Sequence, residues 1–152
     1  MSSKRFSFRL DSVLKLRKHE TERARDELSR AAQKRQKKEA DMLEAKKHLD
    51  EVSRIEIQKG AVDPAKLRQM EAYRQEARAR LVRVQRELER LKNGENEARA
   101  NLIHRRRDEE ALQTLYEQQK EDHERAVEQS EAAFLDEQAI NHHLRKQLDR
   151  KV

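Results

Sequence analysis

Apolar residues recur along this chain with alternating steps of four and three, and this spacing predicts long helices that pack along one stripe. From Leu10, these steps reach thirteen positions as far as Val52, and nine of them are apolar when alanine is counted. From Leu67, the steps reach twenty-four positions as far as Gln147, and fifteen are apolar. We name these thirty-seven residues the core positions. The pattern weakens after Tyr116.

The core positions are irregular at two places. In the first half, the polar exceptions cluster at 17–21 and 35–38, and Arg35 and Lys38 are expected to weaken the pairing there. In the second half, the spacing continues in phase across Gly94. A turn would reset the phase, so Gly94 is expected inside a helix, where it costs about 1 kcal/mol relative to alanine.

One segment carries strong helix-breaking signals. It holds Gly60, which suits a helix C-cap, and Asp63 followed by Pro64, which suit an N-cap and the first helical position. The predicted elements are a first helix over about 10–58, a turn over about 59–65 and a second helix over about 65–150.

The expected fold class is all-α, a long antiparallel two-helix coiled-coil hairpin with a projecting C-terminal helix, forming a single rod over 1–152. In such a hairpin, residues whose numbers add to about 124 face each other, and the second helix overhangs by about 35 residues. A competing arrangement pairs basic residues 1–38 with acidic residues 108–137 around a separate middle element. The continuous heptad phase through Gly94 argues against it.

Composition supports a long helical protein. The 152 residues are 43% charged and only 34% hydrophobic, with two glycines and one proline, which is too little apolar material for an ordinary globular core. Net charge is +6, but residues 1–38 carry thirteen Lys/Arg against five Asp/Glu, and residues 108–137 carry eleven Asp/Glu against two Lys/Arg. So acidic a block is unusual in a protein that coats nucleic acid.

No residues form a catalytic or metal-binding pattern. The chain has no cysteine, and no two of its six histidines are spaced three or four residues apart. We therefore expect no enzyme activity, no cofactor, no metal and no small-molecule substrate. No apolar stretch approaches the roughly 20 residues that span a bilayer, and we expect a cytoplasmic protein.

Two groups of apolar residues are candidates for binding other proteins. Tyr73 lies one position off the core positions, and the hairpin places Met42, Ala45 and Leu49 across from it, which suits either core packing or a docking surface. In the overhang, the expected helix has no partner. Four residues there lie at helical spacings and could enter a hydrophobic groove: Phe134, Leu135, Ile140 and Leu144.

The beginning of the chain resembles a known family. The stretch "FSFRLDSVLKLRKHE" places two phenylalanines before Leu10, then Val13-Leu14, Arg17 and Glu20, and this order resembles the N-terminus of the FliJ family. "FLDEQA" at 134–139 is similar to a late segment of the same family. The length, the polarity and the single break in mid-chain also match.

The resemblance implies a function that the spacing does not show. FliJ proteins are components of the flagellar type III export apparatus and look like the two-helix stalk of rotary ATPases. The resemblance implies binding in the pore of the hexameric export ATPase FliI, promotion of its assembly, contact with the export gate protein FlhA, and contact with export chaperones. It also implies a location on the inner membrane at the flagellar base.

The hairpin geometry then suggests which residues meet each partner. For the ATPase ring, the candidates are Phe6, Phe8, Leu10, Val13, Leu14, Arg17, Phe134 and Leu135. For the export gate, they are Met42, Ala45, Leu49, Tyr73 and Ala77. The main alternative is a generic scaffolding coiled coil that self-associates, and a nucleic-acid-binding coiled coil using residues 1–38 is a weaker one.

Overall fold

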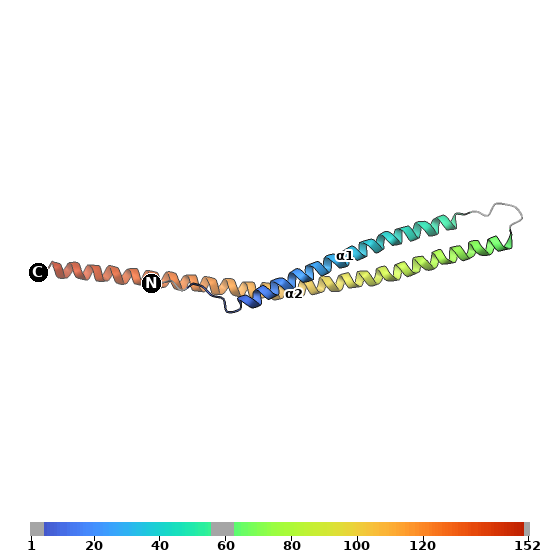
Figure 1. Ribbon diagram of the computed structural model, residues 1–152. Coiled ribbons are helices and arrows are strands. Elements are labelled where there is room, and N and C mark those ends of the chain that lie inside the picture. The colour runs from blue at the N-terminus through green and yellow to red at the C-terminus, as the bar shows by residue number, and fades with distance from the viewer. Residues whose placement is uncertain (1–4, 56–62, 151–152) are drawn as a thin grey trace. The chain divides into compact units, whose positions relative to one another are not determined.

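The structure is a computed structural model that describes residues 5–55 and 63–150. It contains two long helices packed together, α1 (Asp11–Ser53) and α2 (Pro64–Asp149), and no strand occurs in the described ranges (Figure 1). The all-α prediction is confirmed. The helix α1 ends before the expected residue 58, and most of the expected turn over 59–65, including Gly60, lies outside the described residues.

Residue contacts divide the chain into two units, which we treat separately. Unit 1 consists of Met1–His19 and Arg107–Val152, and unit 2 consists of Glu20–Arg106. Each unit therefore contains part of α1 and part of α2. The expectation of a single rod over 1–152 stays a prediction.

The start of α2 follows from its sequence. The Asp63 carboxylate accepts a hydrogen bond from the amide of Ala65 at 3.0 Å, and the Asp63 carbonyl accepts one from the amide of Lys66 at 3.0 Å. Pro64 is the first helical residue, where its missing amide hydrogen leaves no bond unmade. The N-cap prediction for Asp63 is confirmed.

In unit 2, α1 and α2 lie side by side and bury the core positions between them (Figure 1). As the residue number increases along α1, the number of the residue that it contacts on α2 decreases. The contacts are Glu20 with Arg105, Lys38 with Glu87, and His48 with Tyr73. The most buried residues of this unit are Thr21, Ala24, Ala45, Val52, Ala77, Leu88, Glu95 and Leu102. Three are alanines, whose small side chains let two helix backbones approach closely.

The heptad pattern predicts burial well along most of the chain. All thirteen core positions of the first half are buried or half-buried, and so are those of the second half from Met70 to Tyr116. Leu67, the first core position of the second half, is exposed. Among the described core positions after Tyr116, His123 alone is half-buried and the others are exposed. The predicted weakening after Tyr116 is confirmed.

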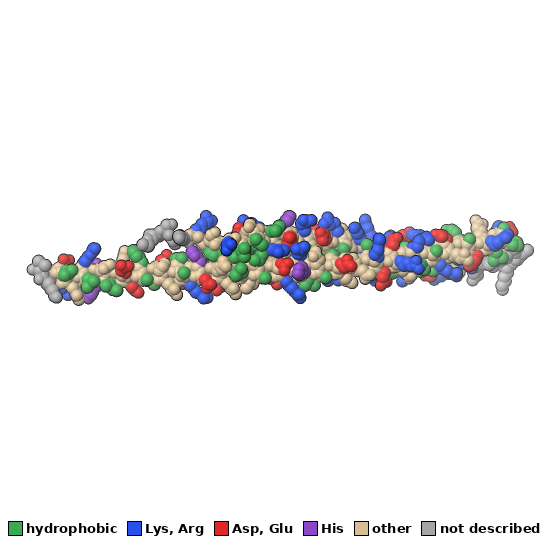
Figure 2. Space-filling model, turned by 90° about the horizontal axis from the view of Figure 1, so that it is seen from below, with side chains coloured by type: hydrophobic (Ala, Val, Ile, Leu, Met, Phe, Trp, Pro, Cys, Tyr) green, Lys and Arg blue, Asp and Glu red, His purple; other side chains and the backbone are tan. Residues whose placement is uncertain are grey.

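Gly94 lies within the uninterrupted helix α2, as the heptad phase predicts. A β-carbon placed there would meet no atom within 4 Å, so neither a turn nor a close contact requires glycine at this position. Charged side chains of both signs are interspersed over the face of the molecule seen in Figure 2. This surface fits a chain whose apolar residues are used mainly along one stripe.

Candidate partner-binding surfaces

In unit 1, the residues before α1 pack against α2 through aromatic rings. Phe8 lies edge-on to Tyr116 with ring centres 5.3 Å apart, and Phe6 lies edge-on to the same ring at 5.5 Å. The Phe6 ring also lies 5.6 Å from the imidazole of His123. We name these four residues the aromatic cluster. Edge-to-face ring pairs at this distance add stabilisation beyond area burial.

The other N-terminal candidates lie in the same unit. Leu14 is buried, and Leu10, Val13 and Arg17 are half-buried. Arg17 also forms an ion pair with Asp108 of α2 at 3.9 Å. The structure therefore brings the six N-terminal candidates for ring binding into one packed region, with Phe8 turned into the molecule rather than toward solvent.

The remaining two ring-binding candidates are in a different setting. Phe134 and Leu135 belong to a stretch of α2 in which every described residue from Glu128 to Arg150 is exposed. Leu135 is 64% exposed. A large apolar side chain this open on a polar helix is available to a partner.

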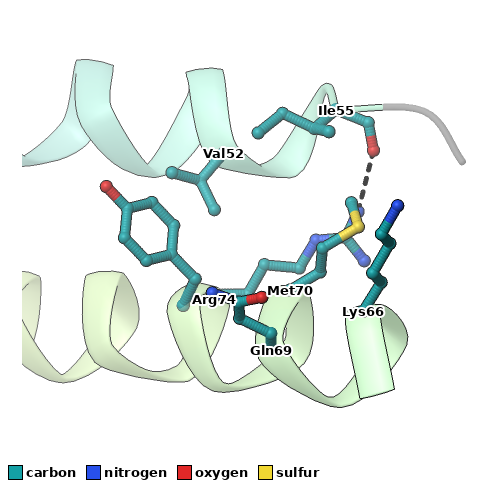
Figure 3. Close-up of a pocket in the computed structure, with 7 residues that line it drawn as sticks. Val52, Ile55, Lys66, Gln69, Met70 and Arg74 are labelled. Carbon is teal, nitrogen blue, oxygen red and sulfur yellow. Dashed lines mark hydrogen bonds between the residues drawn. The ribbon is translucent and has the colours of Figure 1, made fainter. Parts of the chain in front are cut away.

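A cavity of about 350 Å³ lies in unit 2 between the end of α1 and the start of α2 (Figure 3). Val52 and Ile55 line it from the α1 side, and Met70 lines it from α2. The Arg74 guanidinium donates a hydrogen bond to the Ile55 carbonyl at 3.1 Å, while its buried Nε has no hydrogen-bond partner among the described residues. We name this the Tyr73 cavity, and the complete lining is Val52, Ile55, Lys66, Gln69, Met70, Tyr73 and Arg74.

Of the five candidates for gate binding, only Tyr73 lines this cavity, and the candidates differ in exposure. Tyr73 is 56% exposed, and its ring meets the imidazole of His48 edge-on at 5.7 Å. Met42 and Leu49 are half-buried. Ala45 and Ala77 are both buried between the helices, so they position their neighbours and offer no surface themselves.

The middle of unit 2 contains charged residues at core positions. Arg35 forms an ion pair with Glu95 of α2, which is buried and is also a core position. Arg35 forms a second ion pair, at 2.8 Å, with Glu39 on its own helix. Lys38 pairs with Glu87 at 2.7 Å. Arg35 and Lys38 each pair with a carboxylate on the other helix, and the expectation that they weaken the helix pairing stays a prediction. We name Arg35, Lys38, Glu87 and Glu95 the charged layer.

The ion pairs of the charged layer alter proton affinities. Hydrogen bonding to Glu87 raises the pKa of Lys38, and the same bond lowers the pKa of Glu87. Hydrogen bonds to Glu95 and Glu39 raise the pKa of Arg35. Lys38 and Glu87 are therefore both charged across the neutral pH range.

Comparison with known proteins identifies the family. The family model described as "Flagellar FliJ protein" matches residues 6–148, which is nearly the whole chain. The chain belongs to the FliJ family. No curated protein and no solved structure matches it. FliJ proteins are structural or chaperone-like flagellar proteins and are not a known enzyme family. Membership in this family indicates a protein that is related to flagellar export and located at the flagellar base.

Two further observations describe the FliJ-family chain. Over residues 5–55 and 63–150, no three acidic or histidine side chains are grouped so that they could hold a metal ion. Neither described helix combines the length and the apolar character needed to cross a membrane.

Sequence reasoning missed part of each surface of this FliJ-family chain. Four residues that line the Tyr73 cavity were not predicted as part of a site. Three of them are core positions, Val52, Met70 and Arg74, and the fourth is Ile55, which belongs to no pattern in the sequence. His123 is a core position, but nothing in the sequence indicates that Phe6 would lie against it. The expected register, in which facing residues have numbers that add to about 124, places Phe8 opposite Tyr116, and these two rings are in contact.

Proposed function

We propose that this FliJ-family chain is a stalk-like component of the flagellar export apparatus, which binds in the pore of the hexameric export ATPase and couples it to the export gate. The observation that carries the proposal is the family match over residues 6–148 together with the pairing of two long helices. A long two-helix element with a polar surface fits a pore lined by several identical subunits. Such a stalk cannot match every subunit at once, so its individual contacts are weak.

The proposal includes an antiparallel hairpin with a projecting C-terminal helix. Three contacts within unit 2, Glu20 with Arg105, Lys38 with Glu87 and His48 with Tyr73, support the antiparallel order. In unit 1, the Phe6 ring lies against His123 of α2, and every described residue of α2 from Glu128 to Arg150 is exposed. This exposure supports a last part of α2 that projects without a partner helix.

The end that holds the aromatic cluster is the proposed ring-binding end. Phe6 is half-buried and Arg9 is exposed, so part of the cluster region is open to a partner while Phe8 and Tyr116 hold it in place. Leu135 adds an open apolar side chain on α2. In this arrangement the N-terminal residues before α1 and the last part of α2 contact the ATPase together.

Ring binding is tested with the purified ATPase. The double variant Phe134→Ser/Leu135→Ser should bind the ATPase hexamer at least about tenfold more weakly and should stimulate its assembly less, because loss of about 1.4 kcal/mol already gives that factor. The matched control is Val82→Ser, which also removes an exposed apolar side chain from α2. Equal binding by both variants and the parent chain would refute the ring-binding proposal for this surface.

The Tyr73 cavity is the proposed site for the export gate. It is apolar, it lies beside the exposed Tyr73 ring, and Arg74 Nε offers an unused donor at its wall. A short apolar segment of the gate with one acceptor group would fit these features. Chaperone binding is also implied by the family, and no surface of the described residues is assigned to it.

Gate binding is tested by Tyr73→Ala with Ile103→Ser as the control, because Ile103 is another exposed apolar residue of unit 2. The cytoplasmic part of the gate should lose affinity for Tyr73→Ala and keep it for the control. ATPase assembly should be unaffected by Tyr73→Ala, which separates this site from the ring-binding end. A gate that binds both variants equally would remove the assignment.

A further inference from the structure

The last part of α2 has an apolar stripe that nothing in the chain covers. Phe134, Ile140, Leu144 and Leu148 are between 46% and 67% exposed. At 100° per residue, they fall within an arc of about 120° on one side of the helix, and Ala133 falls inside the same arc together with the polar residues Glu137 and Asn141. We name the five apolar residues the C-terminal stripe. Leu135 points to the opposite side of the helix.

Charge is distributed unevenly along this part of α2. Residues 128–137 contain four acidic residues and no lysine or arginine, whereas residues 138–150 contain three lysines or arginines, two histidines and one aspartate. A second copy running parallel would place acid against acid. A second copy running antiparallel would place the acidic half of each helix against the basic half of the other, which favours that orientation.

We propose that the C-terminal stripe pairs with the same stripe of a second copy of this chain, with the two helices antiparallel. The pairing buries apolar side chains that are exposed in the single chain, and the charges select its direction. It concerns the free protein and does not depend on the ATPase or gate assignments.

The core positions restrict the register of this pairing. In an antiparallel pair, core positions of the two alternating kinds face each other, as Thr21 and Arg105 do in unit 2. One such arrangement places Ile140 opposite Glu137 of the second copy, which sets a carboxylate against an apolar side chain and is unfavourable. The other places Ile140 opposite Leu144 and Glu137 opposite Gln147 of the second copy, so we assign this second register.

The paired length is modest, so the dimer should be weak and reversible. An overlap of about 20 residues is about 30 Å of helix, which gives a smaller contact than most stable protein interfaces. Association should therefore depend on protein concentration over the micromolar range. It should also weaken as salt rises, because the charge pairs at the surface of the dimer are screened.

The first test is sedimentation velocity of the full chain over roughly two decades of concentration. A monomer–dimer equilibrium is expected, and Leu144→Ser should weaken it at least about tenfold. Leu135→Ser is the matched control, since it removes an equally exposed leucine from the opposite side of α2 and should leave association unchanged. A chain that stays monomeric throughout, or equal effects of the two substitutions, would overturn the proposal.

The second test measures direction by disulfide formation. The chain contains no cysteine, so single introduced thiols report specific contacts. Glu137→Cys mixed with Gln147→Cys should form a mixed disulfide dimer under mild oxidation, while each variant alone should form much less. Efficient self-crosslinking of each variant alone would show a parallel pair and would contradict the antiparallel assignment.

Discussion

Replacing Phe8 with alanine should release the residues before α1 from α2 without unfolding either helix. Phe8 is only 7% exposed and packs edge-on against Tyr116. Burying a phenylalanine side chain contributes about 1.5–3 kcal/mol. Ordering the backbone of the few residues before α1 costs about 1–2 kcal/mol per residue. The burial of Phe8 therefore offsets the ordering of about one to two of these residues, and its loss should shift the segment toward the released state.

The expected size of the change follows from the same numbers. A loss of about 1.5–3 kcal/mol corresponds to a shift of about 10- to 100-fold toward the released state. Arg9 lies directly after Phe8 and is exposed, so it offers a trypsin cleavage site within the segment that is released. When opening and closing are fast relative to cleavage, the cleavage rate follows the population of the open form.

The assay is limited proteolysis of the full chain with trypsin, followed by mass spectrometry. Cleavage after Arg9 should become about 10- to 100-fold faster in Phe8→Ala, while the far-UV helical signal stays the same. Phe134→Ala serves as the control because it removes a phenylalanine that is already exposed. An unchanged rate after Arg9 would show that Phe8 does not hold this segment, and a lower helical signal would show that the helices depend on it.

Three further outcomes are expected for the helix pair of unit 2. Gly94→Ala should stabilise the chain by up to about 1 kcal/mol, because alanine favours the helix and the added carbon meets no atom; the thermal midpoint by circular dichroism should rise. Ala77→Leu should destabilise it by about 1–3 kcal/mol by overfilling a buried position, whereas Ala79→Leu at an exposed position should have little effect in the same melt. The ion pair between Lys38 and Glu87 lowers the pKa of Glu87 and raises the pKa of Lys38, so it should stabilise the fold at neutral pH. This stabilisation should be lost as pH falls through the lowered pKa of Glu87. It should also be lost as pH rises through the raised pKa of Lys38. Glu87→Gln should flatten the acid side of the midpoint's pH dependence, and an unaltered acid limb would show that this pair does not stabilise the fold.

The charged layer shows what a sequence pattern predicts correctly and what it leaves open. The heptad spacing places Arg35 at a core position, and the structure buries it partly, as that position requires. Its partner Glu95 is on the other helix, sixty residues later in the chain. Without knowing that the two positions face each other, a charged residue at a core position can be judged only as a cost.

The surfaces for partners divide in the same way. Exposure of Phe134 and Leu135 follows from the weak heptad pattern around them, so the sequence indicated it correctly. The hairpin register places Phe8 opposite Tyr116, but the edge-on contact of their rings and the shape of the Tyr73 cavity depend on side-chain packing that no local pattern encodes. Ala45 and Ala77 illustrate the same limit, because an alanine near a surface cluster can equally be a contact or a buried spacer.

Local physical chemistry is enough to specify the two helices of this chain. Heptad spacing, scarce glycine and proline, and the capping pair Asp63 and Pro64 act over a few residues, and each can be read from the sequence directly. Partner choice is different, because it depends on which side chains of α1 and α2 come within a few ångströms of each other. The contacts of Phe6 and Phe8, the charged layer and the cavity beside Tyr73 were therefore decided by tertiary packing, where energies depend on distance in space rather than on distance along the chain.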